Sequence, residues 1–378
     1  MFRCASFFAG VGGIDLGFEQ AGFDVVYANE ICEKASLTFN QNHEIELDTR
    51  DIRNVRSSEI PDFDVMLAGF PCQAFSVAGY RQGFDDEKGR GNLYFELERI
   101  MEEKKPSVVL LENVKNLVGH DKGRTFSIIR NSMQSLGYEI HHKVMNACDY
   151  GDIPQNRERI YIVGFLDSGI SNYFKFPDKV QLETTIGDIF DFEERVDDRY
   201  YYREDAYMYD DLKRDMTSIE TVYQWRRKYV RENKSNLCPT LTANMGTGGH
   251  NVPLIKTHHG FRKLTPKECF MIQGFDRTFV LPENVANSHL YKQAGNSVVV
   301  PVIRRIANSI ISAINLENPV PSEGVIKSDP FEKENNMAKY VIRPLQKEEL
   351  EKFFDGTAKK TIEYFISKAL FAQPELVE

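Results

Sequence analysis

Cysteine is scarce in this sequence, and its few copies lie far apart. The 378 residues include 6 cysteines, and no two of them form a Cys-x-x-Cys pair. Disulfide-held secreted domains and zinc modules both concentrate cysteines at short, regular spacings. The cysteine pattern therefore argues against a disulfide framework and against a zinc site, and it fits a reducing cytosol. We expect no metal ion.

The sequence also lacks the signals of secretion and of membrane insertion. The N-terminal stretch MFRCASFFAG is too short and too glycine-rich for a signal peptide. No apolar run approaches the roughly 20 residues that a membrane-spanning helix needs. We therefore expect a soluble, intracellular protein with no membrane partner.

An excess of positive charge is missing as well. Lys and Arg number 47 against 56 Asp and Glu, and the formal net charge of -9 does not by itself suggest a nucleic-acid partner. The charge is unevenly distributed, however. Residues 183–220 hold 13 acidic and 5 basic side chains, whereas residues 223–263 hold 8 basic and 1 acidic. Such a basic segment can bind phosphates locally, although its charge alone fits a solvated face better.

Short apolar runs alternate with amphipathic segments over residues 3–166. This alternation predicts βαβ units, and hence a largely parallel sheet with helices on both faces. Runs that are apolar throughout are typical of strands buried on both sides. Helices are expected at Leu93–Glu103 and Arg124–Leu136. The strand candidates are CASFFAG, DVVYANE, DVMLAGF, SVVLLENV, EIHHKVMNA and RIYIVGFL.

Periodicity fades after about residue 167, and a loop-rich second domain or insertion is expected there. The stretch 168–260 is rich in Asp, Tyr, Asn and Gly. Helical character returns in SVVVPVIRRIANSIISAI, which we expect to pack back onto the first domain. After Ile314, a polar linker leads to an amphipathic helix candidate near residues 346–371.

Three groups near the N-terminus suggest a nucleoside cofactor. The turn FFAGVGG, residues 7–13, follows the first expected strand and opens a helix, where glycines let a ligand approach the backbone. It lacks the complete G-x-G-x-x-G spacing of a dinucleotide site. Glu30 ends the second strand, where an acidic side chain can bind ribose hydroxyls, and Asp51 is the third candidate. Taken singly, each of these groups could be an ordinary turn glycine or surface carboxylate. Their occurrence in this order favours a nucleoside cofactor.

A second set of groups has the character of a reactive site. Cys72 directly follows the run DVMLAGFP, and Glu112 ends the run SVVLLE. Because the carboxyl ends of parallel strands face one crevice, the thiol and the carboxylate are expected to converge. Gln155, Arg157 and Arg159 alternate with period two in QNRER, on one side of an extended segment. A Cys, a Glu and paired Arg suit covalent activation of an electron-poor ring, although any one of them is more often structural.

Six ordered blocks resemble the DNA (cytosine-5) methyltransferase family. They are FFAGVGG, GFPCQAFS, ENVKNL, QNRERIYIVG, RKLTPKECFMIQGF and QAGNSV, and they extend to about residue 314 with the family's spacing. The combination of Pro-Cys, Glu-Asn-Val and Gln-x-Arg-x-Arg in this order is highly specific. The resemblance implies an α/β fold with a class I, Rossmann-like methyltransferase sheet. It also implies S-adenosylmethionine as methyl donor and a flipped cytosine as acceptor.

The resemblance assigns an expected role to each part of the chain. Residues 1–167 would form the catalytic and cofactor-binding domain, and residues 168–285 a smaller, loop-rich target recognition domain. Residues 286–318 would form the C-terminal helix that packs back on the catalytic domain. Residues 319–378 lie outside the resemblance as a linker and helical tail without an assigned role.

Catalytic and cofactor roles are carried over by motif. The resemblance makes Cys72 the nucleophile that attacks C6 of cytosine and makes Glu112 the group that holds N3 and the exocyclic amine. Arg157 or Arg159 would lie near the base carbonyl. Glu30 would bind the ribose and Asp51 the adenine amino group. The full expected cofactor set is Phe8, Gly10, Gly12, Gly13, Glu30, Ile31, Asp51, Ile52 and Asn296.

Two positions depart from the family pattern. Ile31 follows Glu30 where family members often carry an aromatic residue that stacks on adenine, and Arg50 precedes Asp51 where glycine is more usual. Since Ile31 still offers an apolar face, the departures bear on the affinity for the cofactor rather than on its identity.

The recognition domain is expected to read DNA through the stretch CPTLTANMGTGGHNVPLI. Its Thr240-Leu241-Thr242 resembles the family's recognition-loop signature, and its glycines suit a loop that follows a groove. Polar side chains here can reach base edges, while the basic segment before it positions the duplex through phosphates. The expected DNA-binding residues are Gln73, Ser76, Arg226, Arg227, Thr240, Thr242, Asn244 and Asn251, with Thr247, His250, Lys228 and Arg231 beside them.

The function implied is methylation of C5 of cytosine in a short, specific duplex DNA sequence. The enzyme would protect that sequence from a partner restriction endonuclease, act as a monomer, and work in the bacterial cytoplasm on nucleoid DNA. The alternative kept open is a tRNA cytosine-5 methyltransferase, which shares the catalytic motifs. A catalytically inactive DNA-binding relative is disfavoured because every catalytic position is filled. An NAD-dependent oxidoreductase is disfavoured by the incomplete glycine fingerprint.

Overall fold

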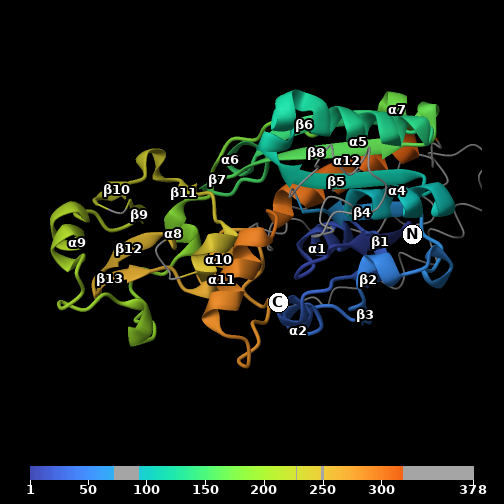
Figure 1. Cartoon of the computed structure of the whole chain (residues 1–378). Helices are drawn as coiled ribbons and strands as arrows, with labels where there is room; N and C mark the ends of the chain where they lie inside the picture. Colours follow the sequence, from blue (N-terminus) through green and yellow to red (C-terminus); the bar gives the residue numbers. More distant parts are fainter. Residues whose placement is uncertain (72–92, 227, 248–250, 318–378) are drawn as a thin grey trace, which may run out of the picture. The chain divides into compact units, whose positions relative to one another are not determined.

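A seven-stranded sheet forms the centre of the fold. The computed structural model describes residues 1–71, 93–226, 228–247 and 251–317. The strand order is β3-β2-β1-β4-β5-β8-β6 (Figure 1). All six apolar runs predicted as strands are strands; β3 was missed because two residues carry no periodic pattern. The strands are β1 (Arg3–Phe7), β2 (Asp24–Asn29), β3 (Leu47–Asp48), β4 (Val65–Gly69), β5 (Val108–Val114), β6 (Glu139–Asn146) and β8 (Glu158–Phe165).

The directions of these strands set the position of the site. Strand β8 runs antiparallel to its neighbours β5 and β6, while β3, β2, β1, β4 and β5 pair in parallel. The strand order reverses between β1 and β4, and ligands of such sheets bind outside the carboxyl ends at this switch point. Because β8 runs the other way, its first residues lie at the same edge, with Arg159 opposite Val114 of β5.

Strand side chains alternate between two hydrophobic cores, one on each face of the sheet. On β4, Val65 and Leu67 belong to the core that α1 and α12 cover, while Met66 and Ala68 belong to the core that α4 and α5 cover. This double burial explains the continuous apolar runs, and the predicted helices at 93–103 and 124–136 are confirmed. The helices here are α1 (Gly13–Glu19), α2 (Glu33–Phe39), α4 (Leu93–Lys104), α5 (Arg124–Ser135), α6 (Ala147–Tyr150), α7 (Ser168–Tyr173) and α12 (Val300–Glu317).

The last two described helices form a long apolar stretch that was not expected from the sequence. The stretch Asn287–Leu316, which covers α11 (Asn287–Asn296) and all but the last residue of α12, is long and apolar enough to cross a membrane by length and composition. The expectation that no run approaches a membrane span was therefore wrong. However, 67% of the apolar window is buried inside the protein, and α12 packs against α1. The burial of a core helix accounts for this composition.

The stretch 201–264 contains a second sheet with a hydrophobic core of its own. The strand order is β10-β9-β12-β13 (Figure 1). Its core is a cluster of Met208, Leu212, Met216, Tyr223, Val230 and Leu254, distinct from the cores of the central sheet. The elements are α9 (Tyr209–Asp215), β9 (Tyr223–Trp225), β10 (Val230–Glu232), β12 (Leu254–Thr257) and β13 (Gly260–Lys263).

Several contacts join the second sheet to the rest of the fold, and Ile255 of β12 belongs to the same hydrophobic cluster as Val65 and Leu67 of β4. A short parallel pair links β11 (Cys238–Pro239) to β7 (Gln155–Asn156). In addition, the fully buried Arg262 of β13 donates to both carboxylate oxygens of Glu268 on α10, at 2.8 and 2.7 Å. The neighbouring helices are α8 (Ile186–Ile189) and α10 (Pro266–Met271).

Candidate active site

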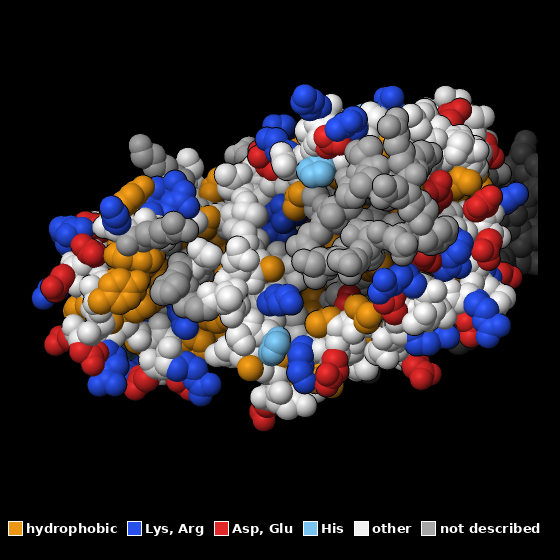
Figure 2. Space-filling view, viewed as in Figure 1, with side chains coloured by type: hydrophobic (Ala, Val, Ile, Leu, Met, Phe, Trp, Pro, Cys, Tyr) orange, Lys and Arg blue, Asp and Glu red, His pale blue; other side chains and the backbone are white. Residues whose placement is uncertain are grey.

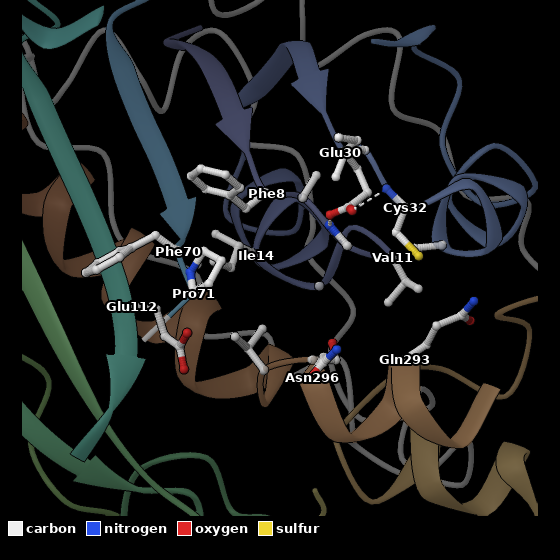
Figure 3. Close-up of a pocket in the computed structure, with 18 of the residues that line it drawn as sticks. Phe8, Val11, Ile14, Glu30, Cys32, Phe70, Pro71, Glu112, Gln293 and Asn296 are labelled. Carbon is white, nitrogen blue, oxygen red and sulfur yellow. Dashed lines mark hydrogen bonds between the residues drawn. The ribbon is translucent and has the colours of Figure 1, made fainter. Parts of the chain in front are cut away.

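A cavity of about 670 Å³ opens at the carboxyl ends of β1, β2, β4 and β5. Figure 3 shows Glu30 and Glu112 in different parts of its lining, with Ile14 and Pro71 between them. Both the expected cofactor residues and an expected catalytic residue thus face one space. The cofactor candidates that line it are Phe8, Gly10, Gly13, Glu30, Ile31, Asp51, Ile52 and Asn296.

The turn after β1 has a backbone conformation that favours glycine. Gly10 and Gly12 have φ values of 61° and 83°, and Phe8, at 56°, adopts a left-handed conformation that costs a non-glycine residue about 1–2 kcal/mol. Gly12 is not a lining residue. A Cβ there would lie 1.9 Å from Nε2 of His43, so Gly12 makes room for an imidazole behind the turn.

Glu30 links the glycine turn to the start of α2. Its Oε2 accepts a hydrogen bond from the Gly10 backbone N–H at 2.9 Å, and its Oε1 accepts one from Cys32 at 2.7 Å (Figure 3). A carboxylate offers about four acceptor positions, so each oxygen retains capacity to accept a bond from a ligand in the cavity. Ile31, 60% exposed, provides an apolar side chain at the same wall.

Asp51 already has a partner on its own turn. Its Oδ1 accepts from the backbone N–H and Nε of Arg53, at 3.0 and 2.9 Å, and its Oδ2 accepts from Nη2 of the same residue. These hydrogen bonds hold the pKa of Asp51 below its ordinary value. Arg50, the other departure from the family pattern, donates to Asp48 and Glu59 and does not line the cavity.

Behind the glycine turn lies a buried polar cluster that sequence reasoning missed. Asp15 is fully buried; its Oδ2 accepts from the Ser6 hydroxyl at 2.9 Å, and its Oδ1 has no hydrogen-bond partner within the described residues. His43 stacks on Phe39 and lies 3.6 Å from Glu19. Burial raises the pKa of Asp15 to about 6, against the opposing attraction of His43.

The catalytic carboxylate candidate is buried beside an arginine. Glu112 is 8% exposed, and its Oε1 lies 3.1 Å from Nε of Arg159. Both side chains line the cavity. Burial raises the pKa of Glu112, although Arg159 and Arg157 pull it the other way. A carboxyl group that keeps its proton above the usual pH can donate a hydrogen bond to a ring nitrogen.

Cys72, Gln73 and Ser76 lie outside the described residues. The chain that leads to them is held at the cavity, which Phe70 and Pro71 line. The buried Asn113 amide donates to the Phe70 carbonyl at 2.8 Å and accepts from the Val114 backbone N–H at 2.8 Å. The carboxyl ends of β4 and β5 are therefore tied together directly before Cys72.

The two arginine candidates, Arg157 and Arg159, have different partners in the structure. The structure brings Arg159 to Glu112, while Arg157 is 3% exposed and is not a lining residue of the cavity. Its guanidinium donates to backbone carbonyl oxygens of Leu241, Gly295 and Ser297. Of the two candidates, Arg159 is the one that lies beside Glu112 in the cavity, and a role for either arginine at the base stays a prediction.

The described DNA-binding candidates are exposed. Arg226, Thr240, Thr242, Asn244 and Asn251 are all accessible, whereas Leu241 and Met245 between them are buried. Figure 2 shows Lys and Arg side chains gathered on the visible face over the β9–β10 region. The buried residues therefore anchor a segment whose polar side chains face solvent. Arg227, Gly248, Gly249 and His250 lie outside the described residues.

Helix α11 contributes cavity residues that the motif search did not name. His289, Lys292 and Gln293 line the cavity beside Asn296. Gln293 accepts from Thr38 at 2.9 Å and donates to the Lys34 carbonyl at 2.7 Å, which ties α11 to α2. No sequence signal marks them, because spacing along α11 alone does not reveal which face meets α2.

Comparisons with known proteins agree with this geometry. Residues 2–312 match the family model described as C-5 cytosine-specific DNA methylase. The chain is 60% identical to type II methyltransferase M.Bsp6I of Bacillus sp. (strain RFL6) over 316 residues, covering 83% of this chain and 100% of the relative. It is 40% identical to type II methyltransferase M.SsoII of Shigella sonnei over 317 residues, covering 83% and 81%.

Solved structures share the fold. The crystal structure of a Spodoptera frugiperda DNMT2 mutant aligns with a TM-score of 0.63 at 20% identity, covering 82% of this chain and 100% of that one. An Escherichia coli prophage protein titled a putative DNA modification methyltransferase aligns with a TM-score of 0.61 at 22% identity, covering 83% and 100%. The family match covers most of the sequence, from the glycine turn to α12. The chain belongs to the C-5 cytosine-specific DNA methylase family.

Proposed function

We propose that this chain is the modification enzyme of a type II restriction-modification system. It transfers a methyl group from S-adenosylmethionine to C5 of a cytosine flipped out of a short duplex DNA sequence. The observation that carries the proposal is the single cavity that joins the Glu30 and glycine-turn wall to the buried Glu112–Arg159 pair. The names of the relatives M.Bsp6I and M.SsoII support the type II assignment.

The cavity walls fit an adenosine-containing cofactor. Glu30 retains acceptor capacity for a ribose diol, and Ile31 and Ile52 offer apolar surface for an adenine ring. Among the described residues, and apart from its chain neighbours, no atom lies within 4 Å of the position that a Gly10 Cβ would take, which lets a ligand approach the backbone. When bound, S-adenosylmethionine supplies an electrophilic methyl group. Asn296 lies on the α11 side of the same cavity.

Glu112 and Arg159 hold the flipped base. The protonated carboxyl of Glu112 donates to N3, and this contact strengthens as negative charge develops on the ring. Arg159 lies 3.1 Å from Glu112, so it orients the carboxyl and faces the base carbonyl. Since both groups are largely buried, their hydrogen bonds act in a medium of low dielectric constant.

Cys72 supplies the nucleophile in this proposal. Its thiolate forms a bond to C6, which places the ring electron pair on C5 for attack on the methyl group. Loss of the C5 proton then expels the thiolate and restores the aromatic ring. The base must first leave the helix, at a cost of a few kcal/mol. Arg226 contacts phosphates, while Thr242, Asn244 and Asn251 read base edges.

The partners follow from this assignment. Duplex DNA is the substrate, and a restriction endonuclease of the same specificity is the functional counterpart. The protein would act in the bacterial cytoplasm as a monomer. Bisulfite sequencing of DNA from cells that express the chain tests the assignment and yields the target. Methyl transfer to duplex DNA and to tRNA is then compared in parallel, and transfer to tRNA alone would overturn the proposal.

A trapping experiment tests the nucleophile. Fluorine at C5 cannot leave as a cation, so 5-fluorocytosine at the target is expected to hold wild-type protein in a denaturant-stable adduct when cofactor is present. Cys72→Ala is expected to bind DNA without forming the adduct. Cys32→Ser is the matched control, because Cys32 also lines the cavity. Cys32→Ser is expected to keep the adduct, and an adduct that survives Cys72→Ala would remove Cys72 from the mechanism.

A further inference from the structure

Arg157 holds together two segments that the sequence separates by more than fifty residues. Its Nη1 donates to the Leu241 carbonyl at 2.7 Å, and its Nη2 donates to the Gly295 carbonyl at 3.1 Å and to the Ser297 carbonyl. Its own backbone N–H donates to the Asn146 side chain at 2.9 Å, which fixes the start of β8. One buried guanidinium thus has acceptors on both segments.

The first segment carries the proposed base-reading residues. Leu241 directly precedes Thr242, and both Thr242 and Asn244 are exposed. The second segment forms a wall of the cofactor cavity, which Gly295, Asn296 and Ser297 line. Arg157 therefore bridges the DNA-facing segment and the cofactor-facing wall without lining the cavity itself.

The two segments touch through their backbones. A Cβ on Gly295 would lie 2.2 Å from the carbonyl carbon of Thr242, and a Cβ on Gly246 would lie 2.2 Å from the Ser288 carbonyl oxygen on α11. No side chain separates them at these points, so a shift of one backbone is felt directly by the other. Protein interiors packed this closely transmit displacements instead of absorbing them.

The charge of Arg157 makes its contacts strong. Burial is the main reason why its pKa falls, to about 9, and the neighbouring Arg159 lowers it further. Within the described residues, the guanidinium donates to three backbone carbonyl oxygens. Hydrogen bonds from a charged donor are roughly twice as strong as bonds between neutral groups. Removing the guanidinium would leave the buried carbonyl oxygens without this hydrogen-bond donor.

We propose that Arg157 is a positioning residue that couples the recognition segment to the cofactor site. Filling the cofactor cavity fixes Gly295–Ser297, which through Arg157 fixes Leu241 and the base-reading side chains after it. Cognate DNA on the recognition segment acts in the reverse direction, because coupling between two sites is reciprocal. The inference rests on the proposed function of both segments.

Binding measurements on the purified full chain test the coupling. The Kd of S-adenosylhomocysteine is measured by calorimetry without and with a duplex that carries the target, for wild type and Arg157→Lys. We expect the duplex to tighten binding about 5- to 150-fold in wild type, the usual range of such coupling, and less than about 2-fold in Arg157→Lys. Lysine keeps the charge but cannot span three carbonyls.

Arg305→Lys is the matched control. Arg305 also donates to two backbone carbonyls, of Tyr150 and Asp178, at 3.0 Å each, but it touches neither the recognition segment nor the cavity wall. It is expected to keep the wild-type coupling. Equal coupling in wild type and Arg157→Lys, or an equal loss in both lysine variants, would overturn the inference.

Hydrogen exchange on the unmodified protein provides a test that does not depend on the folding of a variant. S-adenosylhomocysteine is expected to slow amide exchange in residues 241–247 as well as at the cavity, and to leave residues 223–232 unchanged. If protection is confined to the cavity and wild type still methylates duplex DNA, the inference about Arg157 is overturned and the proposed function is not. A wild type that neither binds S-adenosylhomocysteine nor methylates DNA would overturn the proposed function as well.

Discussion

Replacing the buried Asp15 by Asn is expected to stabilise the protein in a pH-dependent way. Burial raises the pKa of Asp15 from 3.8 to about 6, so the folded chain binds this proton more tightly than the unfolded chain does. The stabilisation from the proton is complete below about pH 4 and is lost as the pH rises through about 6. At roughly 1.4 kcal/mol per pKa unit, keeping the carboxylate ionised costs about 3 kcal/mol at pH 8.

Asparagine removes that cost because its amide does not ionise, while its oxygen can still accept the bond from the Ser6 hydroxyl. Asp15→Asn is therefore expected to exceed wild type in free energy of unfolding by about 3 kcal/mol at pH 8. Linkage reduces the advantage to about half of that at pH 5, where wild-type Asp15 is mostly protonated in the folded state.

Urea unfolding followed by circular dichroism from pH 5 to pH 8 measures the difference. Asp205→Asn is the control for the Asp-to-Asn change itself, because the Asp205 side chain is 77% exposed and lies outside the buried cluster. If Asp15→Asn is less stable than wild type at pH 8, the ionised carboxylate is stabilised in the fold. The attraction of His43 for the Asp15 carboxylate would then outweigh the cost of burying it.

Three further predictions concern catalysis, the C-terminal residues and DNA. Because burial raises the pKa of Glu112, kcat/KM is expected to fall as the pH rises through that value; Glu112→Gln should lower kcat by about 10²–10⁴ and abolish this limb of the pH–rate profile. If Glu112→Gln keeps the same fall in kcat/KM at high pH, another group titrates there. A chain that ends at Pro319 is expected to retain methylation in a bisulfite assay, since M.Bsp6I is matched over its whole length by 83% of this chain; a folded but inactive truncation would contradict this. Arg226→Ala is expected to weaken binding to all duplexes and to reduce the salt slope by about one, whereas Asn251→Ala relaxes sequence preference. Uniform weakening by both substitutions in filter-binding titrations would refute the division of roles.

The central sheet was predictable because its inner strands, β1, β4, β5 and β8, are buried on both faces. Continuous apolar runs such as DVMLAGF follow directly from that burial, and all six were placed correctly. The second sheet was not predicted strand by strand. Its strands are three or four residues long and partly exposed, so neither periodicity nor apolar content marks them.

The candidate site was predictable only where a motif names the residue. Glu30 and Glu112 each lie at the end of a strand, as predicted, and the topology of the sheet brings both to one cavity. The period-two alternation of QNRER did not reveal that Arg157 and Arg159 have different partners. Arg157 binds backbone carbonyls, and a carbonyl group is common to every residue, so its partners leave no trace in the sequence. The Asp15–His43 cluster was missed for a related reason, because only the fold brings its members together.

Under the proposed function, the separate hydrophobic cluster of the second sheet has a consequence for how new specificities arise. Substitutions among Met208, Leu212 and Val230 can be compensated within that core, without repacking the cores of the central sheet. Changes confined to this cluster can therefore remodel part of the sheet, whereas Ile255 of β12 packs in the core of the central sheet and is constrained by it. The places that must be inherited together are the joints, Arg262 with Glu268 and Arg157 with Leu241. Chimaeras that exchange recognition parts between relatives should therefore be cut so that each of these pairs comes from one parent.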